Sequence, residues 1–293
     1  MTHKAGFVNI IGNPNVGKST LMNALIGEKL SIITPKAQTT RHRIMGIVSE
    51  EDYQIVFSDT PGILEPHYKL HESMMKFVES TFEDADLFLL VTEIDENFNN
   101  KIVLEKLDKS NIPVIVLINK IDLSDQPAVE AKLSEWKQKL PKAEIMPISA
   151  LRKFNLEKIM SAVISFLPEN PPYFSKEELT DKPEKFFVAE IIREKIFLYY
   201  QKEIPYCAEV LIDSFKEEEV IFKIRAIIYV ARESQKGIVI GNKGAALKKV
   251  GTMARKDMET FLQKKVYLEL FVKVSKDWRD SEPQLKKFGY IFK

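Results

Sequence analysis

A glycine-rich segment near the start of the chain has the residue types and spacing of a phosphate-binding loop. It follows an apolar run of strand length at residues 7–11, has the pattern G-x-x-x-x-G-K-S, and precedes a stretch of helical spacing. Glycines let backbone N–H groups converge on a phosphate, the lysine reaches the terminal phosphates, and the serine hydroxyl is a ligand for Mg²⁺. The residues expected to contact a nucleotide here are Gly12, Asn13, Pro14, Asn15, Val16, Gly17, Lys18, Ser19 and Thr20.

A second polar segment follows the strand predicted over residues 53–57. It consists of Asp59, Thr60, Pro61 and Gly62, and the next residue, Ile63, is also expected beside the nucleotide. A carboxylate at this point is placed to hold Mg²⁺ through water, and a glycine lets its N–H approach a γ-phosphate closely. Together, the two segments predict a site for a nucleoside triphosphate and its magnesium ion.

Two further segments are typical of guanine recognition. Asn119, Lys120, Ile121 and Asp122 follow the strand predicted over residues 114–118, and Ser149, Ala150 and Leu151 follow the strand predicted over residues 144–148. The carboxylate of Asp122 can accept from N1–H and the exocyclic amine of guanine, a pair of donors that adenine lacks. The N–H of Ala150 is available to the guanine carbonyl. Asn-Lys-x-Asp alone is often only a polar loop, but after the first two segments it predicts that the bound nucleotide is GTP. It also argues that the protein is not a small-molecule kinase.

The elements that must position these segments alternate along residues 1–167. Short apolar runs alternate with stretches of helical spacing at residues 70–82 and 128–140. This alternation predicts an α/β domain with a mainly parallel sheet and helices on both faces. One extra strand is expected to form a hairpin with its successor. The predicted strands cover residues 7–11, 43–48, 53–57, 87–91, 114–118 and 144–148.

A proline-rich segment at residues 168–172 marks a domain boundary. Its prolines stop any helix ending at Leu167 and cannot continue a strand ladder. We therefore expect a nucleotide-binding domain over residues 1–167, a linker over 168–184 and a smaller α+β domain over 185–293 with a basic tail. In the smaller domain, helices are predicted over residues 185–200 and 245–262, and strands over 207–215, 220–230 and 266–274.

Charge is distributed unevenly along the chain. The 293 residues include 43 Lys and Arg against 42 Asp and Glu, but residues 236–293 contain 14 basic and 6 acidic side chains, a net charge of +8. A local field of that sign favours a polyanionic partner, and a solvated charged surface is the alternative interpretation.

Composition excludes several classes of protein. A hydrophobic content of 45% with a net charge of +1 excludes a mainly disordered chain. The single cysteine, Cys207, excludes a disulfide scaffold and is expected in the core of a strand. No apolar run approaches the length of a membrane-spanning helix, and the first residues contain no signal-peptide core, so we expect a cytoplasmic protein.

Residues 7–167 resemble the GTPase domain of translation-factor-class P-loop proteins, on the strength of the segments described above. The resemblance implies that a threonine between the first two segments closes over Mg²⁺ and the γ-phosphate; Thr40 matches, with Thr39 as the alternative. It also implies catalytic roles for Lys18, Thr40, Asn15 and Gly62, and Mg²⁺ ligands at Ser19, Thr40 and Asp59.

The residue after the second segment, Ile63, departs from the pattern of Ras-like switches. Those proteins have a glutamine there that orients the attacking water, and isoleucine has neither a donor nor an acceptor. GTPases with such a hydrophobic substitution resemble this chain at Asn15 as well, where an asparagine holds K⁺ in the place of an arginine finger. The resemblance therefore implies slow hydrolysis that is faster in K⁺ than in Na⁺.

A second glycine pair lies in the basic region, before the helix predicted over residues 245–262. A G-x-x-G loop lets the backbone of about four nucleotides pass close to a helix N-terminus. Ile-Val-Ile precedes the loop, and the order of elements resembles a type II KH domain, so we expect RNA binding. A degenerate KH fold that docks a protein is the alternative. The RNA contacts are expected at Ile240, Gly241, Asn242, Lys243, Gly244, Lys248, Lys249 and Arg255.

The whole chain resembles the Era family of KH-domain GTPases, which act in small-subunit assembly. The resemblance rests on Pro-Lys-Ala-Gln-Thr-Thr-Arg-His-Arg at residues 35–43 and on a single carboxy-terminal KH domain ending at residues 272–279. It implies a monomer that uses GTP or GDP, Mg²⁺ and K⁺, and that binds the 3′ end of 16S rRNA and the small ribosomal subunit during 30S biogenesis and rRNA processing. Peripheral association with the inner face of the cell membrane is left open. The alternative function is a nucleotide-sensing RNA tether in which hydrolysis is incidental.

Overall fold

The computed structural model describes residues 2–290 and contains two compact units. The first unit runs to Glu65 and then from Met74 to Asp181, whereas the second contains Pro66–Ser73 and continues from Lys182. The division after Asp181 falls within the segment predicted as a linker. Residues 291–293 of the predicted second domain lie outside the described residues.

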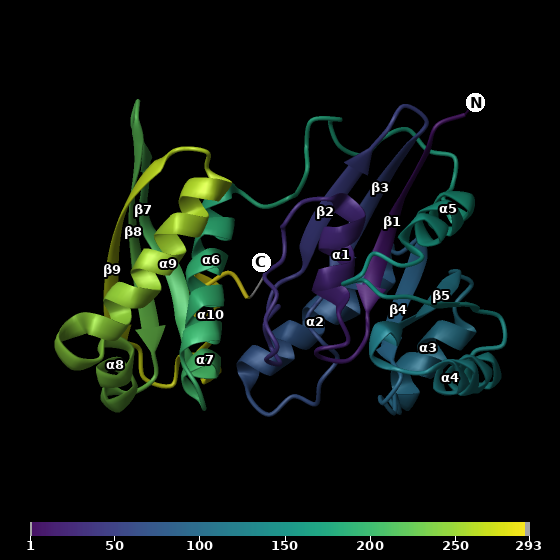
Figure 1. The fold of residues 1–293 in the computed structure, drawn as a ribbon, viewed down its shortest axis with the longest axis horizontal. Coiled ribbons are helices and arrows are strands. Elements are labelled where there is room, and N and C mark those ends of the chain that lie inside the picture. Colours follow the sequence, from purple (N-terminus) through teal and green to yellow (C-terminus); the bar gives the residue numbers. More distant parts are fainter. Residues whose placement is uncertain (1, 291–293) are drawn as a thin grey trace. The chain divides into compact units, whose positions relative to one another are not determined.

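A six-stranded sheet forms the centre of the first unit (Figure 1). The strand order is β2-β3-β1-β4-β5-β6, in which β2 is antiparallel to β3 and the other neighbours are parallel. The central strands are buried on both faces, which accounts for their continuous apolar runs. The strands are β1 (Lys4–Ile11), β2 (Ile44–Ser49), β3 (Tyr53–Asp59), β4 (Leu87–Glu93), β5 (Val114–Asn119) and β6 (Glu144–Pro147). The prediction of a mainly parallel sheet with one extra hairpin strand is confirmed.

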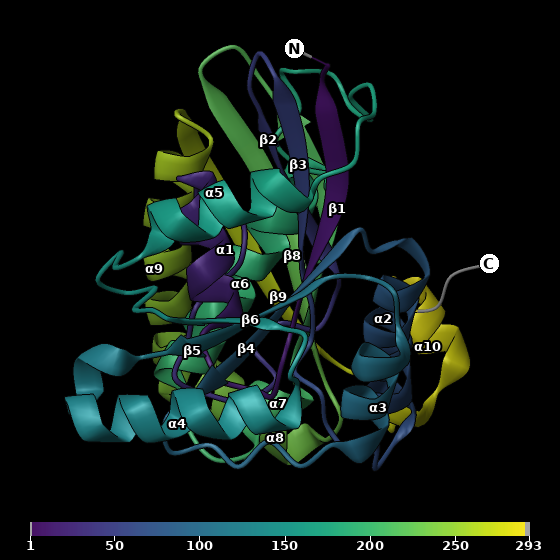
Figure 2. The same ribbon diagram turned by 90° about the vertical axis from the view of Figure 1, so that its right-hand side faces the viewer.

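Helices cover both faces of this sheet, as predicted. Figure 2 shows α1 and α5 on one face and α2 and α3 on the other. Helix α3 was not predicted; it begins after Asn100, whose side chain accepts a hydrogen bond from the N–H of Val103. The helices are α1 (Lys18–Ile26), α2 (Lys69–Asp84), α3 (Lys101–Lys109), α4 (Gln126–Lys139) and α5 (Leu156–Phe166), with a 3₁₀ turn η1 (Ile121–Leu123).

The segment that follows α5 packs against the first unit. The buried side chain of Gln54 on β3 accepts hydrogen bonds from the N–H groups of Tyr173 and Phe174 at 2.8 and 3.0 Å, and donates to the carbonyl of Phe174 at 2.9 Å. Farther along, the N–H of Ile47 on edge strand β2 donates to the carbonyl of Leu179 at 2.9 Å. The segment therefore covers part of an edge that would otherwise expose unpaired backbone groups.

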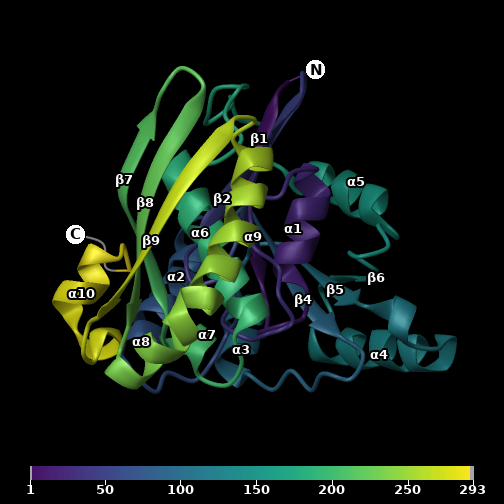
Figure 3. The same ribbon diagram turned by 60° about the vertical axis from the view of Figure 1, so that its left-hand side comes forward.

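The second unit is a three-stranded sheet with helices α6 and α9 packed on it (Figure 3). Strand β8 lies in the centre, antiparallel to β7 and parallel to β9. One core joins β8 residues such as Ile224 and Ile228 to Ile192 of α6 and Met258 of α9. The elements are α6 (Glu184–Tyr199), α7 (Ile204–Cys207), β7 (Glu209–Glu217), β8 (Ile221–Val230), α8 (Glu233–Ile240), η2 (Asn242–Gly244), α9 (Ala245–Phe261), β9 (Lys265–Val274), η3 (Trp278–Asp280) and α10 (Glu282–Lys287).

The placement of Cys207 in a strand was wrong. Cys207 ends the short helix α7, which has Pro205 in its first turn, and β7 begins only at Glu209. Proline fixes a helical φ angle, so the start of the apolar run is a helical turn rather than a strand. The cysteine is nevertheless buried, and its backbone carbonyl accepts a hydrogen bond from the indole Nε1 of buried Trp278 at 2.9 Å. Trp278 is therefore a packing residue of the second unit.

Candidate nucleotide site and RNA groove

The glycine-rich loop connects β1 directly to α1 and leaves the start of the helix without a side-chain cap. Gly17 is the N-cap residue with φ 98°, and the first turn contains no acidic residue. A Cβ atom at Gly17 would lie 2.3 Å from Nδ2 of Asn119, so only glycine fits this backbone. Uncapped N–H groups and an uncompensated helix dipole together form a site for an anion.

Lys18 is buried beside this helix start. Its Nζ donates hydrogen bonds to the carbonyls of Gly12 at 3.0 Å and Asn13 at 2.7 Å. Burial lowers the pKa of Lys18 to about 8, although the carboxylate of Asp59 opposes the shift. Burial also raises the pKa of Asp59. Both charged groups thus lack solvation, and a polyphosphate with a divalent cation would supply the opposite charges that each of them needs.

Three side-chain oxygen groups converge beside the start of α1. The hydroxyl of Ser19 donates to Oδ2 of Asp59 at 2.6 Å and lies 2.9 Å from Oγ1 of Thr40, which lies 3.3 Å from the same carboxylate oxygen. Oδ1 of Asp59 is buried and has no hydrogen-bond partner among the described residues. Hydroxyl and carboxylate oxygens are the donors that Mg²⁺ prefers, so these residues fit a magnesium ion.

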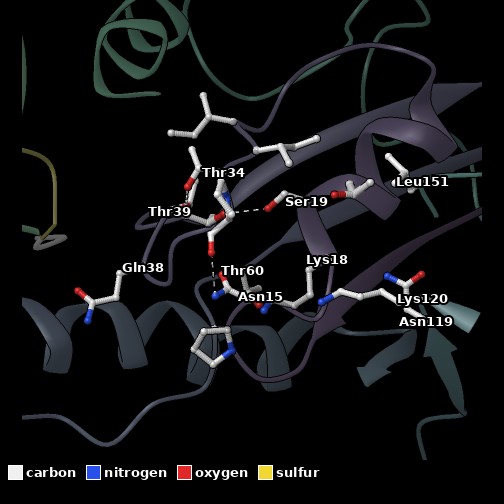
Figure 4. Close-up of a pocket in the computed structure, with 18 of the residues that line it drawn as sticks. Asn15, Lys18, Ser19, Thr34, Gln38, Thr39, Thr60, Asn119, Lys120 and Leu151 are labelled. Carbon is white, nitrogen blue, oxygen red and sulfur yellow. Dashed lines mark hydrogen bonds between the residues drawn. The ribbon is translucent and has the colours of Figure 1, made fainter. Parts of the chain in front are cut away.

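The geometry favours Thr40 over Thr39 as a ligand. Thr39 lies near the same cavity, but its hydroxyl is engaged within its own loop. Its Oγ1 lies 2.6 Å from Oγ1 of Thr34 and donates to the carbonyl of Lys36 at 2.6 Å (Figure 4). Thr40, by contrast, shares hydrogen bonds with Ser19 and Asp59.

The guanine-type segments are joined by the side chain of Asn119. Its Nδ2 donates to the carbonyl of Val16 at 2.8 Å, and its Oδ1 accepts from the N–H of Ala150 at 2.9 Å. The hydroxyl of Ser149 donates to Oδ1 of Asp122 at 2.6 Å. Asn119 therefore ties the phosphate loop to the base end of the site, and Ser149 orients the carboxylate that would read the base.

These loops surround a cavity of about 590 Å³ in the first unit. The predicted residues that line it are Pro14, Asn15, Gly17, Lys18, Ser19, Thr20, Thr40, Thr60, Gly62, Asn119, Lys120, Asp122 and Leu151. The predicted residues that do not line it are Gly12, Asn13, Val16, Asp59, Pro61, Ile63, Ile121, Ser149 and Ala150. Several of the predicted residues outside the lining form the hydrogen bonds described above with residues that line the cavity.

Sequence reasoning missed some of the lining. Ile33 and Leu123 are apolar, line the cavity, and are 42% and 79% exposed. Leu123 lies directly after the Asn-Lys-x-Asp segment, and with Leu151 it supplies apolar surface beside Asp122. The position of apolar Leu123 directly after the polar Asn-Lys-x-Asp segment was the sequence signal that could have indicated a lining residue. The other missed lining residues are Ile32, Thr34, Pro35 and Gln38.

The residues around the expected γ-phosphate position differ in whether their side chains reach the cavity. Ile63 is turned into a core cluster with Ile11 and Phe88, so its side chain does not line the cavity. A Cβ atom at Gly62 would lie 2.6 Å from the backbone of Pro14. Asn15 is exposed in the cavity, and its Nδ2 lies 3.4 Å from the carbonyl of Pro35.

The G-x-x-G loop connects two helices of the second unit. Gly241 ends α8 with φ 71°, and Gly244 is the N-cap of α9 with φ 79° and no side-chain cap. Beside it, a groove of about 340 Å³ is lined by residues of α9 and β9. Helix α8 was not predicted, and it places the loop between two helix ends. The groove residues are Gly244, Leu247, Lys248, Gly251, Thr252, Arg255, Leu268 and Leu270.

The structure places only part of the predicted RNA set in the groove. Gly244, Lys248 and Arg255 line it, and Asn242 and Lys243 are exposed at the loop. Ile240 precedes the loop and Gly241 is its first residue, and neither of them lines the groove. Lys249 does not line it either, since its Nζ lies 5.1 Å from the ring centroid of Tyr199 on α6. Consecutive helical residues point about 100° apart, so Lys248 and Lys249 cannot share a face.

Known proteins match both units. The family model described as "50S ribosome-binding GTPase" matches residues 7–120, and the one described as "KH domain" matches residues 203–279. A protein named GTPase Era from Clostridium kluyveri is 47% identical over 290 residues, covering 98% of this chain and 99% of its own. The chain belongs to the Era family of GTPases. A GTPase Era from Caldanaerobacter subterraneus is 46% identical and covers 99% of each chain.

Solved structures agree with this assignment. The crystal structure of Era in complex with MgGDPNP and nucleotides 1506–1542 of 16S ribosomal RNA has a TM-score of 0.95 and 40% identity, covering 99% of this chain and all of that one. Aquifex aeolicus Era with one Tyr-to-Ala substitution, bound to GDP and AlF₄⁻, has a TM-score of 0.94 and 40% identity, with coverage of 99% and 100%. The predicted fold, a P-loop GTPase domain followed by a KH domain, is confirmed. Among residues 2–290, no helix has the length and apolarity needed to cross a membrane.

Proposed function

We propose that this chain is a GTP-hydrolysing switch that binds the 3′ end of small-subunit rRNA and acts in 30S subunit biogenesis. One observation carries the proposal: the Era structure that resembles this chain holds MgGDPNP and 16S rRNA nucleotides in the same complex. The loops that would hold each ligand are both built here from this chain's own residues. One family description names the 50S subunit, but the rRNA in that complex is 16S, which supports the small subunit.

The cavity supports GTP as the nucleotide. Lys18 and the uncapped start of α1 lie at the phosphate end, and Asp122 lies at the base end between Leu123 and Leu151 in the lining. A carboxylate held by Ser149 fits the two donors of guanine. Mg²⁺ held through Ser19, Thr40 and Asp59 would neutralise charge that develops on the phosphates. Lys18 of the phosphate-binding loop and the N–H of Gly62 in the segment after β3 would both stabilise the γ-phosphate.

The KH groove supports RNA as the second ligand. Its floor carries apolar Leu268 and Leu270, and its rim carries the cations Lys248 and Arg255. Apolar surface accepts bases, while cations and an uncapped helix start accept the backbone phosphates. The GTP state is proposed to favour the RNA-binding arrangement, with hydrolysis as the timer that ends it.

The test is binding of the full chain to a fluorescent oligonucleotide of the small-subunit rRNA 3′ end. Binding is measured with GDP and with a non-hydrolysable GTP analogue across a salt series, because phosphate contacts are salt-dependent. Tighter binding with the analogue supports the switch. Equal affinity with both nucleotides would favour the RNA-tether alternative instead, and no binding above a scrambled oligonucleotide would contradict the RNA function.

We further propose that Asn15 holds a K⁺ ion that takes the place of a water-positioning side chain. Ile63 is buried in the core, and Asn15 is exposed in the cavity near the carbonyl of Pro35, which would supply a second oxygen ligand. Hydrolysis should therefore be faster in KCl than in NaCl at equal ionic strength, and Asn15→Ala should abolish that difference. Phosphate release measured in both salts checks this, and equal rates for the unaltered protein would refute it.

We propose that the chain acts as a cytoplasmic monomer. Its single cysteine and its ribosomal RNA partner support that compartment. Light scattering of the purified chain tests the monomer. Sedimentation with vesicles of anionic lipid tests the alternative of peripheral association with the inner membrane face.

A further inference from the structure

The KH sheet has a second face, opposite the groove helices, that is only partly covered. Residues of β8 alternate between the core and this outer face, as a pleated strand requires. Near one end of β8, the ring centroid of Tyr229 lies 5.1 Å from that of Phe288, and the Tyr229 hydroxyl accepts a hydrogen bond from Nζ of Lys287 at 3.0 Å. The segment around α10 therefore covers that part of the face. Farther along the same face, Tyr267 and Phe271 of β9 are 53% and 45% exposed.

The strand register shows which side chains share the uncovered part. Between β7 and β8, Lys216 pairs with Lys223 and Ser214 with Arg225. Between β8 and β9, Lys223 pairs with Tyr267 and Arg225 with Glu269, whereas the partner of Phe271 is Ile227, which is buried. We name the open sheet face as Lys216, Lys223, Arg225, Lys265, Tyr267, Glu269, Phe271 and Lys273. The open sheet face contains five cations and one carboxylate, with two exposed aromatic rings among them. One of the cations, Lys223, also forms an ion pair with Glu218 at 2.9 Å.

Local contacts hold this surface in a defined arrangement. The guanidinium of Arg225 lies 5.6 Å from the ring centroid of Phe271 and donates hydrogen bonds to the carboxylate of Glu269 at 3.2 and 3.3 Å. The one acidic group is thus already neutralised by a neighbour. Tyr267 and Phe271 lie four residues apart on one strand, about 13 Å at the usual rise per residue.

The open sheet face is also continuous with the groove around one strand. Strand β9 is at the edge of the sheet (Figure 3), and its side chains alternate between the two surfaces. Leu268 and Leu270 line the groove, whereas Tyr267 and Phe271 are on the open face. A strand of RNA leaving the groove across this edge would meet the aromatic rings directly.

We propose that the open sheet face is a stacking platform for single-stranded RNA that extends beyond the segment held in the groove. The inference rests on the proposed RNA function and adds a second contact surface to it. Exposed aromatic rings among cations bind successive bases and phosphates without a need for a defined sequence. A protein partner fits less well, because lysine is depleted from the cores of protein interfaces and four of the five cations here are lysines.

The experiment compares a short and a long RNA on the full chain in the presence of a GTP analogue. The short probe is a ten-nucleotide oligomer of the small-subunit rRNA 3′ end, and two long probes carry ten added uridines at the 5′ or the 3′ end. The variant Tyr267→Ala with Phe271→Ala removes both rings, each of which is about half exposed. Because stacking on one ring changes affinity by roughly 5-fold to 150-fold, we expect a loss of at least about 10-fold for one long probe and no change for the short probe.

A second variant tests the charges separately. Lys265→Gln with Lys273→Gln should reduce the slope of log affinity against log salt by about 1.4 for that long probe, since each phosphate contact to a single strand contributes about 0.7. Exposed Lys153→Gln with Lys158→Gln in the first unit is the matched control and should leave the slope unchanged.

The outcomes separate this proposal from the function on which it rests. If the unaltered chain binds long and short probes equally, or if the ring variant binds both as tightly as the unaltered chain, the platform is refuted while groove binding stands. If the ring variant retains RNA affinity but loses binding to purified small subunits, the face contacts a ribosomal protein and the platform is refuted. If the unaltered chain binds neither probe, the RNA function itself fails.

Discussion

Replacing Asn119 with alanine should destabilise the first unit even in the absence of nucleotide. The side chain is buried and bridges two loops, with bonds of 2.8 Å to the carbonyl of Val16 and 2.9 Å from the N–H of Ala150. Both partners are backbone groups of buried residues, so Asn119→Ala leaves a carbonyl and an N–H without a partner and without water. An unsatisfied buried group costs about 1–3 kcal/mol, so two of them predict a loss of about 3 kcal/mol.

Thermal unfolding of the nucleotide-free protein measures this loss. For a domain of this size, 1 kcal/mol shifts the midpoint by about 2–4 °C, so the expected decrease is about 6–12 °C. Nucleotide must be removed first, because a ligand that binds only the folded state adds its own stabilisation. Trp136 is buried in the first unit and Trp278 in the second, so tryptophan fluorescence reports the unfolding of both units together. In a Trp278→Phe background, the signal reports the unfolding of the first unit.

The matched control is Asn99→Ala, because Asn99 is exposed in the same unit. It should leave the midpoint within about 1 °C, the usual range for a surface substitution. An unchanged midpoint for nucleotide-free Asn119→Ala, combined with weaker GDP binding, would refute the reasoning. Asn119 would then act by touching the nucleotide rather than by joining the loops that surround it.

Three further predictions concern the other loops and the second unit. Gly244→Asp should lower RNA affinity by roughly 10-fold because it puts a carboxylate beside the backbone phosphates. Gly244→Asn, which needs the same backbone conformation but has no charge, should bind normally in the same gel-shift assay; equal losses would point to strain instead. Gln54→Ala should speed amide exchange at Tyr173 and Phe174 by roughly 10-fold or more without changing GDP affinity, since it removes the hydrogen bonds that hold that segment. Exchange at the original rate would contradict the role of Gln54. Burial raises the pKa of Tyr200, so the second unit should keep its full stability below about pH 10 and lose it as the pH rises further, because only the unfolded tyrosine ionises readily. Tyr200→Phe should remove that extra loss and cost about 1 kcal/mol at neutral pH, and parallel pH curves for the two proteins would disprove the assignment.

The candidate nucleotide site could be predicted because its chemistry depends on residue types at fixed spacing. Gly17, Lys18 and Ser19 act through a backbone shape, a charge and a hydroxyl that the sequence states directly. The sequence could not separate Thr39 from Thr40, since both have the same side chain in the same loop. Only the fold places the hydroxyl of Thr40, and not that of Thr39, within reach of Asp59.

Features that depend on tertiary contacts could not be predicted in the same way. Helix α8 has no strong apolar periodicity, and it is held by contacts to α9 and β9 that a local pattern does not contain. The segment after α5 has the prolines of a linker, yet it packs on Gln54 because that side chain offers both a donor and acceptors to a neighbouring backbone. Lys249 was assigned to the groove on charge alone, and helix geometry turns it toward Tyr199.

The two units share one backbone feature that suits a phosphate. Gly17 begins α1 and Gly244 begins α9, each with a positive φ angle and no side-chain cap, so each helix start is open to an anion. The surroundings decide which anion is held. Beside Gly17, the cation is buried Lys18 in an enclosed cavity, which suits a compact polyphosphate with its metal ion. Beside Gly244, the cation is exposed Lys248 on an open groove, which suits the backbone of an extended nucleic-acid strand. The same kind of helix terminus therefore lies beside a buried cation in one unit and beside an exposed cation in the other.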